Sequence, residues 1–190
     1  MDDHDDDDGP GADGVFGLRS QVVGGLPIIN RVIDRLGLPV LLGQALGVGD
    51  ARVKLPAAAA IRLVVTNLVL GREPLYALGE WAARHDPAML GLTVDEVSAV
   101  NDDRVGRALE ALFDADRASL LTAVVLRAVA EFDVDTGQLH NDSTSISLHG
   151  DYRGATGAER AGKPTAAVTY GHSKDHRPDL KQLVWILTVS

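Results

Sequence analysis

The 190-residue chain contains no cysteine, which excludes disulfides and thiolate metal sites and fits a reducing compartment. Its N-terminus lacks the basic residues with which a signal peptide begins. No uninterrupted apolar run is long enough to span a membrane, since the longest candidate, residues 55–71, is broken by Arg62 and Asn67. We therefore expect a cytoplasmic protein with no membrane partner.

Positive charge is missing from the first 14 residues, which hold seven aspartates and no Lys or Arg. This segment contributes -7 to the formal net charge of -9, so the rest of the chain is close to neutral. A run of like charges repels itself and buries no apolar surface. The sequence predicts a disordered acidic tail over residues 1–20.

Apolar residues at helical spacing dominate the sequence between residues 26 and 133, which predicts a helical N-terminal domain over 21–136. Gly37 and Pro39 separate the first two helices, Pro56 suits the start of another, and Asn101 or Asp102 can cap a later one. The residues expected to face inward are Ile28, Ile29, Val32, Ile33 and Leu36 in the first helix, Leu75, Leu78 and Trp81 or Ala82 after Pro74, and Val105, Ala108, Leu109 and Leu112 after Asn101. A last helix is expected to end near Phe132.

Beyond Gly137 the period of the pattern changes to two, which is typical of strands. Residues 138–148 alternate, with Asp142 on the face that carries Ile146 and Leu148, and residues 183–190 form an apolar run typical of a strand covered on both faces. The whole chain is therefore expected to be α+β. Two strands do not make a stable sheet, so we expect residues 137–190 to be the poorly packed beginning of a longer domain.

Asp142 is the candidate functional residue of the first strand, because aspartate is depleted in strands. Its apolar neighbours suggest a partly buried carboxylate, which would need a partner or a metal such as magnesium. The alternative is that Asp142 caps a neighbouring turn. A further alternative combines His140 and Asp142 with a distant histidine (His149, His172 or His176) in a two-His, one-carboxylate iron site of an oxygenase.

The segment between the strands, residues 149–182, is longer than a hairpin loop and contains the basic stretch "YGHSKDHRPDLKQL". Its candidate DNA-binding residues are Lys174, His176, Arg177 and Lys181. Asp175 and Asp179 offer the alternative of local ion pairing around Pro178. We expect residues 150–166, with four glycines and no apolar stripe, to be mobile without DNA.

Four stretches in this order, "PLYALGEWA", "NDDRVGRALEALF", "LHNDSTSISLHGDY" and "YGHSKDHRPDLKQLVWILTVS", resemble the N-terminal portion of bacterial insertion-sequence transposases of the DDE class. The similarity is to the insertion-sequence-four group with a DUF4277-type helical N-terminal domain. It covers about residues 22–190 and is most specific at "SKDHRPDLKQ".

This resemblance implies that residues 137–190 begin an RNase H-like catalytic domain whose first strand carries the first catalytic acid, at Asp142. Such enzymes use two magnesium ions, held by three carboxylates, to cleave and join DNA, and act as homo-oligomers on transposon ends and target DNA. The second Asp and the Glu have no counterpart among these 190 residues, so a transposase fragment is expected to be inactive alone. The runner-up hypothesis is a non-catalytic helical module for DNA binding or assembly.

Overall fold

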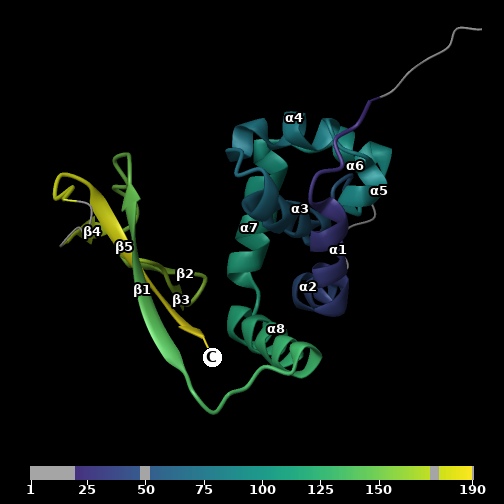
Figure 1. The fold of residues 1–190 in the computed structure, drawn as a ribbon. Coiled ribbons are helices and arrows are strands. Elements are labelled where there is room, and N and C mark those ends of the chain that lie inside the picture. The colour runs from purple at the N-terminus through teal and green to yellow at the C-terminus, as the bar shows by residue number, and fades with distance from the viewer. Residues whose placement is uncertain (1–19, 48–51, 172–175, 190) are drawn as a thin grey trace, which may run out of the picture.

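The computed structural model describes residues 20–47, 52–171 and 176–189, and it confirms the predicted α+β class. Figure 1 shows a group of helices on one side and a long two-stranded ribbon on the other, joined by the segment after the last helix. The helices lie between residues 26 and 132, and the strands lie between residues 140 and 189. In the described part of the chain, no helix is both long and apolar enough to cross a membrane.

Eight α-helices and one 3-10 helix make up the described helical part. They are α1 (Leu26–Arg35), α2 (Leu38–Leu46), α3 (Ala57–Leu70), η1 (Leu75–Ala77), α4 (Leu78–Ala83), α5 (Pro87–Leu90), α6 (Val94–Ser98), α7 (Asp102–Asp114) and α8 (Arg117–Phe132). Gly37, in the left-handed region at φ 62°, separates α1 from α2, because glycine adopts this conformation without steric cost. Asn101 caps α7 as predicted, since its side chain accepts a hydrogen bond from the backbone N–H of Arg104. Pro56 lies one residue before α3.

The buried apolar core lies wholly in the helical part, among the described residues. Leu26, Leu63, Leu78 and Val105 have no exposed surface, and α3 packs against both α2 and α7. Three predicted inward residues are wrong, because Ile28 is 71% exposed, Leu75 is 39% exposed and Val32 is 38% exposed. Nearby residues supply the core contact instead: Leu26 two positions before Ile28, Ile33 next to Val32, and Leu78 one turn after Leu75.

The strands form one sheet of order β1-β5-β4 and a separate two-stranded hairpin. The elements are β1 (His140–Leu148), β2 (Glu159–Arg160), β3 (Lys163–Pro164), β4 (Thr169–Tyr170) and β5 (Lys181–Val189). β1 and β5 are antiparallel, in a register that runs from His140 opposite Val189 to Leu148 opposite Lys181. The apolar run of β5 is not covered within the described residues, because Val184, Trp185 and Ile186 are all more than half exposed, which agrees with the poor packing expected for residues 137–190.

The β2–β3 hairpin lies within the connection that separates β1 from β5 and contacts the helical part. Arg160 of β2 forms an ion pair of 3.4 Å with Glu110 of α7, and its guanidinium lies 5.6 Å from the centre of the Phe113 ring. Lys163 of β3 donates to backbone carbonyl oxygens at the end of α7. Residues 150–166 thus contain short strands with defined contacts; their mobility stays a prediction.

Candidate functional site

Asp142 lies near the start of β1, opposite Leu187 of β5 in the antiparallel register. Hydrogen bonds of the ladder fix the backbone on both sides of it, and the side chain of the preceding residue adds a further link, since Thr188 Oγ1 donates to Asn141 Oδ1 at 2.5 Å. A carboxylate on a paired strand is held in a defined direction, as a catalytic or metal-binding group requires. β1 is an edge strand of this sheet.

The prediction that Asp142 is partly buried is wrong. Its side chain is exposed, as are those of Thr144 and Ile146 on the same face, whereas Ser143 and Ser145 on the opposite face are half-buried. The alternation of period two is therefore present, but the more covered face is the serine face. The prediction of burial failed because it took Ile146 and Leu148 to mark the buried face of the strand.

The described residues do not form a metal centre around Asp142. No group of three or more His, Asp or Glu side chains in the described ranges is placed to hold a metal ion. His140 and Asp142 share a strand face, but His149 and His176 do not join them in such a group, and His172 lies outside the described residues. A two-magnesium site with three carboxylates therefore does not fit this part of the chain, and neither does the two-His, one-carboxylate iron site.

The basic residues predicted to contact DNA are partly occupied by contacts within the chain. The guanidinium of Arg177 forms a fork with Asp179, with Nε and Nη2 at 2.8 and 2.7 Å from the two carboxylate oxygens. This hydrogen bonding lowers the pKa of Asp179 to about 2. The alternative of local ion pairing around Pro178 is thus realised at Arg177.

The structure also describes His176 and Lys181, which lie before and at the start of β5, whereas Lys174 lies outside the described residues. Lys181 Nζ donates to the backbone carbonyl of Asp151 at 2.6 Å, and His176 adopts a positive φ of 55°. In the register Lys181 faces Leu148, six positions along β1 from Asp142, or about 20 Å at the usual rise of a strand. The structure therefore does not bring the basic loop and the candidate acid together.

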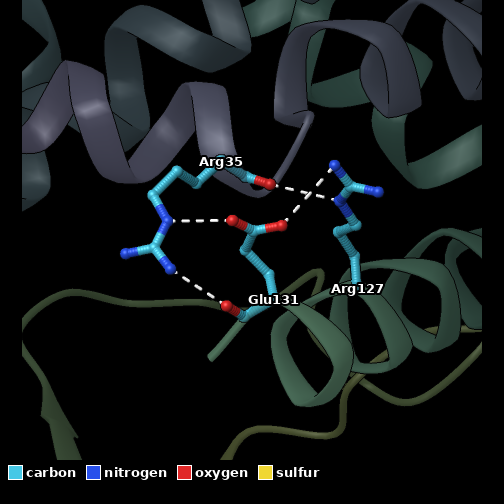
Figure 2. Close-up of polar contacts among 3 residues, drawn as sticks. All are labelled: Arg35, Arg127 and Glu131. Carbon is cyan, nitrogen blue, oxygen red and sulfur yellow. Dashed lines mark hydrogen bonds and ion pairs between the residues drawn. The ribbon is translucent and has the colours of Figure 1, made fainter. Parts of the chain in front are cut away.

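A small polar cluster fixes the end of α8, from which the chain continues toward β1 (Figure 2). Glu131 accepts from Arg35 Nε at 2.9 Å and lies 3.8 Å from Arg127 Nη2, while Arg127 Nε donates to the carbonyl of Arg35. The hydrogen bond from Arg35 is the main reason that the pKa of Glu131 lies below its ordinary value. Arg35 also stacks 4.2 Å from the centre of the Phe132 ring. These contacts connect α1 with α8.

Sequence reasoning missed a basic pocket beside the start of α3. Arg52 and Lys54 from the preceding segment and Arg104 and Arg107 from α7 line it together. No local motif marks these residues, because they are separated by about fifty positions and meet only through the packing of α3 on α7. The sequence shows only that two basic residues lie close together in each of the two segments, Arg52 with Lys54 and Arg104 with Arg107.

The comparison with protein families matches residues 18–126 to "Domain of unknown function (DUF4277)". This match covers more than half of the chain, and the chain belongs to that family. It spans the helices from α1 into α8, and β1 and Asp142 lie beyond its end. No curated protein and no solved structure matches the chain.

Proposed function

We propose that this chain is the N-terminal portion of a DDE-class insertion-sequence transposase. The DUF4277 helical unit precedes the strand that carries the first acid of the catalytic triad, Asp142. The enzyme's activity is metal-dependent cleavage and joining of DNA, with insertion-sequence ends and target DNA as its partners.

The observation that carries this proposal is the position of Asp142. It is an exposed acid within a backbone ladder, where aspartate is unfavourable, and among the described residues its carboxylate accepts no capping hydrogen bond from a turn. It lies within "NDSTS", the position at which the resembling family carries its first catalytic acid. An exposed side chain that destabilises its own strand is better explained by a chemical role than by a role in folding.

Among the described residues no two further acids are placed to share a metal ion with Asp142, so metal-dependent cleavage would need carboxylates from outside this part of the chain. The contribution of this chain is one metal-coordinating carboxylate, Asp142, held in a fixed direction by β1. The 190-residue chain is expected to show no nuclease activity with magnesium or manganese, because one carboxylate does not assemble a two-metal site.

The test is a longer version of the protein that contains the remaining catalytic domain, assayed for binding and cleavage of its own insertion-sequence ends. Asp142→Asn keeps the size of the side chain and one acceptor oxygen but removes the negative charge that a metal ligand provides. We expect unchanged DNA binding and loss of cleavage.

Asp151→Asn is the matched control, because Asp151 is likewise an exposed aspartate and lies just after β1. Among the described residues it pairs with Arg153 at 2.5 Å and, through its carbonyl, with Lys181. It should retain most of the cleavage activity. Full cleavage by the Asp142→Asn protein would show that the assigned residue, or the family, is wrong.

A second candidate function, a helical module for DNA binding or assembly that acts without catalysis, is favoured by one observation. All residues of the buried apolar core lie in the helical part, so this unit has what it needs to be stable alone. Cleavage that depends on Asp142 would exclude this reading for the complete protein.

A further inference from the structure

The basic pocket is a hollow of about 420 Å³ between the segment that precedes α3 and the exposed side of α7. Its floor contains the buried side chains of Leu55 and Ala108, and its described lining includes no acidic residue. Arg52, Lys54 and Arg107 are exposed, and Arg104 is half-buried.

This concentration of positive charge contrasts with the rest of the helical part. Residues 20–136 contain 15 acidic and 11 basic side chains, and four of those 11 bases line this one pocket. A net acidic unit does not attract nucleic acid as a whole, so any contact with phosphate has to be local. The mean charge of the unit is therefore a poor guide to what this surface binds.

Two of the four cations are oriented by the backbone of α7 and the turn before it. Arg104 Nη1 donates to the carbonyl of Ala99 at 2.7 Å, and Arg107 Nε donates to the carbonyl of Asp103 at 3.3 Å. Each guanidinium has further N–H donors beyond these bonds, and within the described part of the chain neither Arg104 nor Arg107 forms an ion pair. Both guanidinium groups are thus held in place at the edge of the pocket and keep N–H donors that a ligand can use.

We infer that this pocket binds backbone phosphates of duplex DNA. Arginine presents donors that match phosphate oxygens in pairs, and lysine adds a mobile point charge. Two arginines one turn apart on α7 and Lys54 on the facing segment can contact successive phosphates along one strand. The inference stands on the pocket and does not depend on Asp142 as a catalytic acid.

The test measures binding of the 190-residue chain to a fluorescein-labelled duplex of random sequence by anisotropy, between 50 and 200 mM salt. The variant Lys54→Gln/Arg107→Gln removes two exposed cations from the pocket. Each lost phosphate contact lowers the slope of log K against log salt by about 0.9, so we expect a slope smaller by about 2 and an affinity at least about tenfold lower at 50 mM salt.

The matched control is Arg31→Gln/Arg72→Gln, which removes two exposed cations of the helical part outside the pocket. Exposed charges act over about 10 Å at 0.1 M salt, so the control should change affinity less than threefold. Lys54→Arg/Arg107→Lys, which keeps both charges, should bind like the unchanged chain and shows that the loss does not come from misfolding.

Three results would overturn the inference. The first is equal loss of binding in the pocket variant and the control, which would mean that net charge alone acts. The second is no binding of duplex DNA by the chain at 50 mM salt. The third is competition by inorganic phosphate as strong as by DNA at equal phosphate concentration, which would assign the pocket to a free anion. None of these readouts involves cleavage, so they leave the assignment of Asp142 untouched.

Discussion

Lys163 Nζ lies 2.5 Å from the backbone carbonyl oxygen of Ala115, just past the end of helix α7. It also donates to the carbonyl of Asp114 in the last turn. The last carbonyls of a helix have no partner within the helix, and a cation there is favoured by the helix dipole. One lysine of the β2–β3 hairpin therefore completes the end of α7 and fixes the hairpin to the helical part.

Removing this ammonium group should loosen the hairpin without unfolding the helices. Lys163→Gln shortens the side chain and removes its charge, so we expect faster amide hydrogen exchange over residues 154–168 and unchanged exchange in α3. Arg153→Gln is the control, since Arg153 is highly exposed and, in the part of the chain that the structure describes, pairs with the nearby Asp151 alone. Equal protection of the hairpin in the Lys163→Gln protein and the unchanged chain would show that the contact does not hold it.

Leu63 should carry a large share of the stability of the helical part. It is fully buried in the core between α3 and its neighbours. Leu63→Ala removes buried methyl groups and leaves a cavity, which costs about 2–5 kcal/mol of unfolding free energy. Leu126→Ala, at a side chain that is 64% exposed on α8, should cost less than about 0.5 kcal/mol. Urea denaturation measures both, and a similar cost for the two would contradict the assigned core.

Glu131 should make the chain less stable as the medium becomes acidic. Its pKa is lower in the folded chain than its ordinary value of 4.5, chiefly because Arg35 hydrogen-bonds to it. Its contribution is therefore fully present above pH 4.5 and is lost as the pH falls through the folded-state pKa. Glu131→Gln should flatten the loss of unfolding free energy below pH 4.5, measured by urea denaturation at several pH values. An unchanged pH profile would mean that the cluster of Figure 2 does not form in solution.

Asp179 provides a direct readout of whether Arg177 is occupied. With the fork intact, its pKa should be about 2, measured by carbon-13 NMR of the carboxyl group. Arg177→Gln removes both donors, so the pKa should rise toward the ordinary value of 3.8. In the pH range between these values the unchanged chain keeps the carboxylate and the variant gains a proton. A pKa near 3.8 in the unchanged chain would mean that Arg177 is available for phosphate.

Local signals in the sequence predicted several helix ends and the two long strands, because Gly37 and Asn101 determine helix ends through their own backbone and side-chain chemistry. The short elements α5, α6, β2, β3 and β4 were not predicted. Burial was predicted less well. Ile28 and Asp142 belong to regular patterns, but a pattern shows which residues share a face and not which face a neighbouring element covers. The α3–α7 packing is a long-range contact, so the pocket lined by Arg104 and Arg107 was beyond any local reading.

The proposal that Asp142 is the first of three catalytic acids in a transposase is tested most directly by the nucleotide sequence of the source DNA on the 3′ side of codon 190, translated in all three frames. If Asp142 has this role, one frame continues with RNase H-like sequence, supplies a further Asp and a Glu, and is enclosed by inverted repeats. A downstream region that encodes an unrelated protein, with no such acids and no repeats, would contradict it.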